Sequence, residues 1–217
     1  MTSFFEPLIL YWVLFFRISA GAAVPDSSVE FSEFVEIARI VSYSIPSLLL
    51  VWYLMLKIKP LKEWGITLPR KRDIIPATLA FSALFLIGLT ISLVSPHINR
   101  IPASPRFLPP RTIFPWVILV VSCFSTAYLE ETFFRMYLLS KRKEMRIGPH
   151  RAILLSTLLF SICHVYEGPW GFLNAALSGV VLAFVFVRFQ SLHGVAVAHA
   201  LYNILVFVLG SLPAGPQ

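Results

Sequence analysis

Charged residues are scarce in this sequence of 217 residues, since Asp, Glu, Lys and Arg together make up 13%, about half of what soluble proteins carry. Hydrophobic residues make up 57%. This composition argues against a soluble globular domain. It instead predicts helices of about 20 apolar residues, the length that crosses the hydrocarbon core of a bilayer.

Cysteine is also rare, and no internal repeat or low-complexity tract is visible. The two cysteines, Cys123 and Cys163, both lie in apolar stretches, which indicates buried free thiols rather than a disulfide framework. We therefore expect residues 1–217 to form a single transmembrane domain.

Seven stretches are apolar enough, or nearly so, to cross a membrane. The fold class they predict is all-α, a polytopic transmembrane helical bundle with about seven spans (six to eight). The first stretch ends near SAGAA, which resembles a signal-peptide cleavage site, but Arg17 interrupts its core and no Lys or Arg precedes it. A retained helix is expected there. The stretches are about 4–24, 34–56, 74–96, 113–139, 151–166, 169–187 and 192–212.

The net charge of +7 comes from basic residues that lie between the apolar stretches. The linkers 57–72 and 141–151 are strongly basic, whereas 25–33 and 166–170 contain acidic residues and no base. By the positive-inside rule this alternation predicts a cytoplasmic N-terminus and an external C-terminus. The basic residues then face anionic lipid headgroups, and no nucleic-acid partner is indicated. The exception is the proline-rich segment 97–112, predicted to be an extended external cap, which carries Arg100, Arg106 and Arg111.

Two adjacent carboxylates, Glu130 and Glu131, stand in an otherwise apolar segment. A charge at the centre of a membrane helix costs roughly 2.5–3.5 kcal/mol, so such residues are candidates for function. Glu131 precedes Arg135 by four residues, the favourable order for an ion pair on one helix. Glu130 points about 100° away and has no such partner, so it needs one from another segment, or water, or a proton.

Two histidines in later apolar stretches are the candidate partners. His164 follows Phe160 by four residues, and His199 precedes Asn203 by four, so each pair shares a helix face. Counted from the basic linkers at about 1.5 Å per residue, Glu130, His164 and His199 lie roughly 16, 20 and 16 Å deep. This shared depth predicts that they and Asn203 meet at one polar site.

Each of these residues has a simpler interpretation when taken alone. An intramembrane His or Asn is commonly an interhelical hydrogen-bonding residue, Cys123 has the position of a packing residue, and His193 that of an interfacial one. Taken together, titratable groups on three helices favour a catalytic site over separate structural roles.

Three short motifs combine these residues: EETFFR at 130–135, FSICH at 160–164 and HALYN at 199–203. As EExxxR, FxxxH and HxxxN in this order, they resemble the CAAX prenyl endoprotease and bacteriocin-processing (CPBP, or Abi) family of intramembrane proteases. The resemblance covers about 120–205, within a motif-bearing part at about 113–212.

The resemblance implies a catalytic set of Glu130, His164, His199 and Asn203. Glu130 would activate water with the help of His164, while His199 and Asn203 would stabilise the oxyanion, a contribution of about 3–4 kcal/mol per donor. Glu131 and Arg135 would hold the helix in place, and Phe160 belongs to the structural part of the second motif.

Several alternatives stay open at this point. No cofactor is expected, although two His and one Glu also make a zinc set, here without an HExxH motif. A proton-coupled transporter uses similar residues, and a non-catalytic immunity or scaffold protein would share the family's motifs. The expected enzyme is an endopeptidase of a prokaryotic inner or plasma membrane. It would act on a membrane-anchored protein or peptide, such as a C-terminal sorting tail, a lipid-anchored tail or a bacteriocin leader.

Overall fold

The fold is known from a computed structural model, which describes residues 5–16, 29–98, 107–108, 110 and 112–211. Helices account for nearly all of these residues, so the predicted all-α class is confirmed. The elements are α1 (Phe5–Tyr11), η1 (Trp12–Phe16), β1 (Val29–Glu30), α3 (Glu33–Arg39), η2 (Ile40–Ser44), α4 (Ile45–Ile58), η3 (Leu61–Trp64), η4 (Lys71–Asp73), α5 (Ile74–Ile98), β2 (Phe107–Leu108), α6 (Ile113–Glu131), η5 (Thr132–Tyr137), α7 (Leu138–Ser140), η6 (Lys141–Lys143), α8 (Pro149–Ile162), η7 (Val165–Glu167), α9 (Gly168–Phe189) and α10 (Leu192–Gly210).

The seven predicted apolar stretches all contain helix, but they differ in length. Five helical segments are long and apolar enough to cross a membrane: 33–58, 71–98, 113–143, 165–189 and 192–210. The two others, Glu6–Phe15 and Pro149–Ile162, are shorter. The end of the first predicted stretch, including Arg17 and SAGAA, lies outside the described residues.

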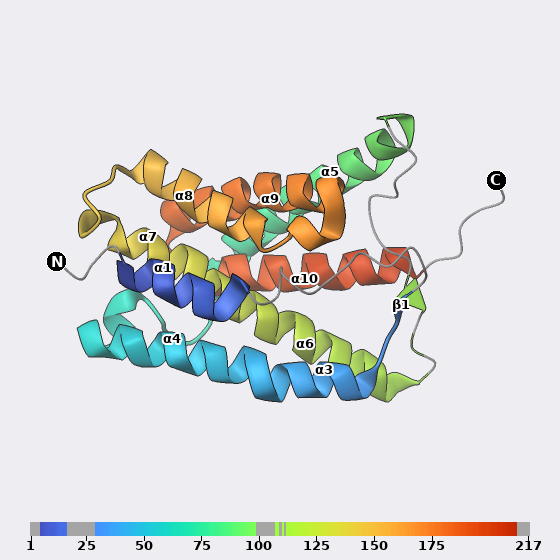
Figure 1. The fold of residues 1–217 in the computed structure, drawn as a ribbon, viewed down its shortest axis with the longest axis horizontal. Coiled ribbons are helices and arrows are strands. Elements are labelled where there is room, and N and C mark those ends of the chain that lie inside the picture. Colours follow the sequence, from blue (N-terminus) through green and yellow to red (C-terminus); the bar gives the residue numbers. More distant parts are fainter. Residues whose placement is uncertain (1–4, 17–28, 99–106, 109, 111, 212–217) are drawn as a thin grey trace.

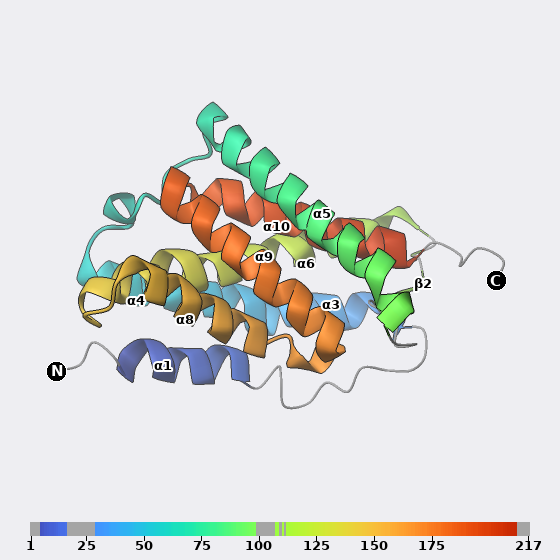
Figure 2. The same ribbon diagram turned by 90° about the horizontal axis from the view of Figure 1, so that it is seen from above.

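The helices run side by side, with α10 in the middle (Figure 1). It packs mainly against α5 and α6, while α9 packs against α5 and α8. Helices α5 and α9 cross the others obliquely (Figure 2). The basic linkers after α4 and α7 lie at the end of the bundle where α1 begins (Figure 1). The predicted alternation of basic and non-basic linkers requires these two linkers to lie on the same side of the membrane.

Glycine lets α10 approach α5 closely at two points. A Cβ atom on Gly194 would lie 2.7 Å from Cγ of Pro76, and one on Gly88 would lie 2.4 Å from the Tyr202 hydroxyl oxygen. Small residues at helix interfaces are the usual basis of packing in membranes, where lipid is as apolar as the side chains. This packing places α10 at the centre of the bundle.

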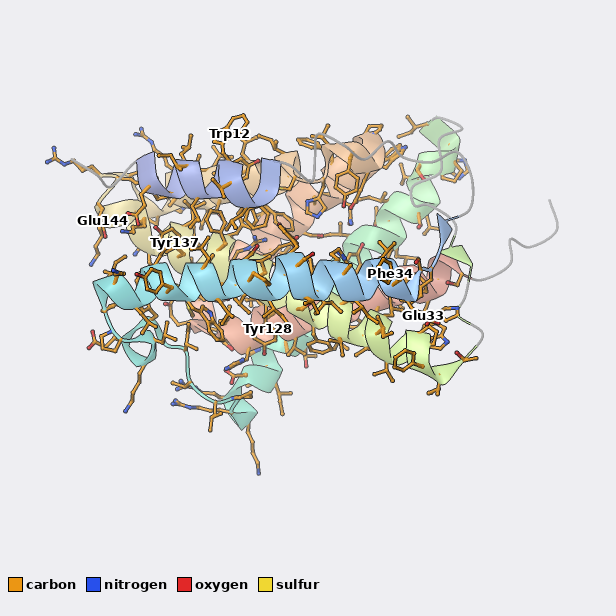
Figure 3. The ribbon with its side chains drawn as sticks, turned by 60° about the horizontal axis from the view of Figure 1, so that its bottom comes forward. Trp12, Glu33, Phe34, Tyr128, Tyr137 and Glu144 are labelled. Carbon is orange, nitrogen blue, oxygen red and sulfur yellow. The ribbon has the colours of Figure 1, made fainter. Side chains whose placement is uncertain are left out.

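Large apolar side chains cover the outside of the bundle. Phe34 is 81% exposed and Ile113 80% exposed, and Trp12 points outward from η1 (Figure 3). Water would penalise such a surface, whereas lipid would not. The protein is therefore an integral membrane protein.

Two irregular features interrupt the long helices. The segment η5 continues α6 as a π-helix directly after Glu131, and η2 is a π-helical turn that precedes Pro46 of α4. Proline cannot donate a backbone hydrogen bond, and π turns of this kind often occur near functional sites.

One short parallel β pairing joins Val29–Glu30 to Phe107–Leu108. It was not predicted, because two-residue strands leave no periodic pattern in the sequence. Most of the predicted cap at 97–112, including its three arginines, lies outside the described residues.

Candidate active site

A fully buried ion pair lies at the junction of α6 and η5. Nε of Arg135 is 3.1 Å from Oε2 of Glu131, and neither side chain is exposed. The spacing of the two residues predicts this pair. Because an unpaired charge at this depth would cost several kcal/mol, the two residues stabilise each other.

Glu131 also contacts α10 through its second carboxylate oxygen. Oε1 accepts a hydrogen bond from Nδ1 of His199 at 2.9 Å. The sequence assigned only Arg135 to this carboxylate, so the histidine is an additional partner. Glu131 is thus held by a cation one turn further along its own helix and by a histidine on α10.

Glu130 lies on the other side of the same imidazole ring. Its Oε2 is 3.7 Å from Nε2 of His199, and its side chain is 11% exposed. The separation is too long for a direct hydrogen bond. The two neighbouring carboxylates therefore differ in burial and in partners. Glu131 is fully buried and bound to Arg135 and His199, whereas Glu130 has some accessible surface and no direct hydrogen bond to His199.

His164 lies just beyond the end of α8, in the short turn that leads to α9. Its Nδ1 is 2.9 Å from the carbonyl oxygen of Phe160. A carbonyl oxygen only accepts, so Nδ1 carries the proton and a neutral ring keeps a free lone pair on Nε2. The FxxxH spacing thus fixes which nitrogen of His164 is available to the site.

The ring of Phe160 lies between three of the predicted site residues. Its centroid is 4.6 Å from that of His164 and 5.9 Å from that of His199. The Arg135 guanidinium carbon is 4.4 Å from the same ring, a cation–π distance. Among the described residues, the three Arg135 guanidinium nitrogens have no hydrogen-bond partner, so its charge is met by the ion pair with Glu131 and by the rings of Phe160 and Phe134.

Asn203 follows His199 by one turn of α10 and is partly buried. Within the described part of the chain, no hydrogen bond or ion pair joins Asn203 or His164 to either glutamate. The structure thus brings Glu130, Glu131, Arg135, Phe160 and His199 into one set of contacts, with His164 attached through Phe160.

Two polar residues near the site were missed as partners by the sequence analysis. Tyr128 of α6 lies 2.8 Å from Nδ1 of His193 on α10, whereas His193 was taken for an interfacial residue. No motif covers this pair. The only sequence signal is that each residue precedes a motif on the same helix.

Zinc is held by three or four protein ligands, with nitrogen and oxygen atoms at about 2.0–2.2 Å and cysteine sulfur at about 2.3 Å. Across the described segments, no three His, Cys, Asp or Glu side chains are grouped in a way that could hold a metal ion. His199 uses Nδ1 for Glu131, which leaves Nε2 as its one nitrogen for another ligand. Both cysteines are free thiols.

The fold and this set of contacts define a polytopic helical membrane protein with a carboxylate–histidine site buried among its helices. Residues 112–205 match the sequence profile of the family described as Type II CAAX prenyl endopeptidase Rce1-like. This match confirms the resemblance predicted from the three motifs, all of which lie within the matched segment. No curated protein and no solved structure gives a match.

Proposed function

We propose that this protein is an intramembrane endopeptidase that hydrolyses one peptide bond of a membrane-anchored protein or peptide with water activated by Glu130. The observation that carries this proposal is the difference between the two carboxylates. Glu131 is enclosed by Arg135 and His199, whereas Glu130 is partly exposed beside Nε2 of the same histidine. Of the two carboxylates, only Glu130 has accessible side-chain surface, and it is therefore the one that can meet a water molecule.

Hydrolysis begins when water attacks the carbonyl carbon of the substrate and gives one proton to Glu130. His164, with Nε2 free, orients that water or shares its proton. Collapse of the tetrahedral intermediate breaks the C–N bond, and the proton on Glu130 passes to the leaving amine. The hydroxyl group from water stays on the new carboxyl terminus.

His199 and Asn203 stabilise the oxyanion in this proposal. Nδ1–H of His199 donates to Glu131, so Nε2 also carries a proton only when the ring is an imidazolium. Nε2–H of His199 and the Asn203 amide then supply the two donors, each worth about 3–4 kcal/mol in transition-state stabilisation.

The proposed reaction uses no metal ion. Its support is the donor set, because the described residues form no group of three His, Cys, Asp or Glu side chains that could hold an ion. Water activation is then the task of the carboxylate base Glu130 with the help of His164.

We also propose that the end of the bundle with the basic linkers faces the cytoplasm of a prokaryotic cell. The C-terminal end of α10 then faces outward. A site within the bilayer admits an extended or locally unwound segment, because unpaired backbone groups are tolerated there only next to protein or water. A C-terminal sorting tail or a lipid-anchored tail fits this requirement.

The test compares one peptide sequence in two forms, within the same liposomes that contain the purified protein. One form carries a membrane-anchoring helix or acyl chain, and the other is free and soluble. We expect the anchored form to be cut with a much higher kcat/KM. Equal cleavage of both forms would contradict the proposed substrate class, and transport without cleavage would contradict the proposed reaction.

A further inference from the structure

His193, which belongs to none of the three motifs, lies in the first turn of α10 and makes two short polar contacts. Its Nδ1 is 2.8 Å from the Tyr128 hydroxyl on α6, and its Nε2 is 2.5 Å from the carbonyl oxygen of Thr67 in the linker before α5. One side chain therefore joins three elements of the bundle.

The partners of His193 settle where its protons are. The Thr67 carbonyl oxygen can only accept, so Nε2–H of His193 donates to it. In a neutral ring Nδ1 then accepts, and the Tyr128 hydroxyl is the donor. Both nitrogens are satisfied in this single arrangement, which gives the ring a defined orientation.

The same two helices are joined a second time at the candidate active site. Tyr128 precedes Glu131 by three residues, about 4.5 Å along α6, and His193 precedes His199 by six residues, about 9 Å along α10. The hydrogen bond from His199 to Glu131 is the second connection. With one hydrogen-bonded contact, two helices can still rotate relative to each other about that point. A second contact at a distance from the first restricts both this rotation and a shift of one helix along the other.

The first turn of α10 is also attached to the segment that precedes α5. The Ser191 hydroxyl donates to Oδ1 of Asp73 at 2.6 Å and accepts from the backbone nitrogen of Gly194 at 2.9 Å. Oδ2 of Asp73 accepts from the backbone nitrogen of Arg70 at 2.7 Å. The position of His193 is thus fixed by the hydrogen bonds of the first turn of α10, and its contact with Tyr128 fixes α6 relative to that turn.

We propose that Tyr128 and His193 are positioning residues for the hydrolysis: they set the register of α6 against α10, so that His199 meets Glu131 and faces Glu130. This inference rests on the proposed function and adds two residues that its motifs do not contain. Neither residue touches the reacting atoms. A displacement of about 1 Å at a catalytic group lowers rates by as much as 100-fold, so the register matters for turnover.

Three variants and one control separate this role from general stability. Tyr128→Phe keeps the ring, whose centroid is 5.8 Å from that of His193, and removes the donor. His193→Leu removes both hydrogen bonds, whereas His193→Gln offers an amide to Thr67 and to Tyr128. Tyr202→Phe is the matched control, because it removes a hydroxyl that connects α10 to Asn174 of α9 instead of α6.

The first measurement is the kinetics of anchored-peptide cleavage in liposomes. We expect Tyr128→Phe and His193→Leu to lower kcat by about 10- to 100-fold with KM within about twofold of the wild type. His193→Gln should recover part of the loss, and Tyr202→Phe should match the wild type. The double variant Tyr128→Phe/His193→Leu should be no slower than His193→Leu, because both changes break one connection.

The second measurement does not depend on proteolysis. The chain has five histidines, so the imidazole N–H signals of ¹⁵N-histidine-labelled protein are few, and the signal lost in His199→Gln identifies the Nδ1–H bound to Glu131. This signal should shift or broaden in Tyr128→Phe and His193→Leu and stay unchanged in Tyr202→Phe.

The two readouts separate failure of this inference from failure of the proposed function. If the wild type cuts no anchored peptide but the His199 signal responds as expected, the protease proposal fails, while Tyr128 and His193 still set the register of α6 against α10. If the His199 signal and kcat are unchanged in Tyr128→Phe and His193→Leu, the positioning role is wrong, even where both variants melt at a lower temperature.

Discussion

His199 of α10 lies between two consecutive glutamates of α6, with Nδ1 2.9 Å from Glu131 and Nε2 3.7 Å from Glu130. The two nitrogens lie on opposite sides of one ring, so a single histidine meets both carboxylates although neighbouring helix residues point about 100° apart. The arrangement gives the two acids different tasks. Glu131 fixes His199 by a hydrogen bond to Nδ1, whereas Glu130 lies beside Nε2 without a direct hydrogen bond.

The first prediction concerns the buried ion pair. Glu131→Gln leaves the Arg135 guanidinium without its counter-ion, so we expect a loss of about 3–5 kcal/mol in the free energy of unfolding. The measurement is thermal or denaturant unfolding of the purified variant in detergent. A melting curve equal to that of the wild type would contradict the assignment of Glu131 as the partner of Arg135.

A double variant supplies the control for this pair. In Glu131→Gln/Arg135→Met both charges are gone, and replacing a buried ion pair by neutral side chains of similar volume costs little. We expect the double variant to be more stable than Glu131→Gln alone. Additive losses in a double-mutant cycle would instead mean that the two side chains do not interact.

The second prediction concerns Phe160, whose ring contacts both histidines. Phe160→Leu removes that ring and loosens His164 and His199, so we expect kcat to fall by at least about tenfold. Phe133→Leu is the matched control, because Phe133 is fully buried and packs against Phe15 and Tyr137. Both variants should lose about 0.5–3 kcal/mol in stability, and only Phe160→Leu should lose turnover beyond that. Equal loss of kcat in the two variants would count against a role for Phe160 in orienting the histidines.

The third prediction concerns metal ions. A reaction that uses Glu130 as its base and no metal ion should continue in EDTA and in 1,10-phenanthroline, and elemental analysis of the active protein should find less than one zinc per chain. If phenanthroline abolished cleavage and added zinc restored it, the metal-free mechanism would be overturned.

The fourth prediction concerns orientation. Glu33 and Glu144 lie at opposite ends of the bundle (Figure 3), and Lys143 beside Glu144 is exposed. In a background with Cys123→Ala and Cys163→Ala, we expect a cysteine at position 33 to react with an impermeant maleimide added outside intact cells. A cysteine at position 143 should react only after the membrane is opened. The opposite pattern would reverse the proposed topology.

Much of the fold follows from the sequence because hydrophobicity and loop charge act locally. The five long helices and the two shorter ones lie where apolar runs predict them. The depth of the site residues in the membrane was harder to estimate, because it was counted from charged residues, and these do not mark where a helix begins. Arg188 belongs to α9, and α10 begins at Leu192, so His199 lies about 10 Å into its helix instead of 16 Å from the start of the span.

The contacts between helices could be predicted only in part. The Glu131–Arg135 pair follows from a spacing of four on one helix, whereas the hydrogen bonds of His199 to Glu131 and of His193 to Tyr128 depend on how α6 and α10 cross. A single sequence contains no periodic signal for that crossing. The π-helical geometry of η5 is equally hidden, because it changes the hydrogen-bond pattern without changing the apolar character of the segment.

The most direct test of the account is the cleavage rate of Glu130→Gln in liposomes that contain the anchored peptide. An amide cannot accept the proton of water, and it leaves the Glu131–Arg135–His199 contacts in place. We predict a normal melting temperature and a kcat at least about 10³-fold below that of the wild type, at the upper part of the range for general base catalysis. Cleavage at the wild-type rate by folded Glu130→Gln would contradict the account.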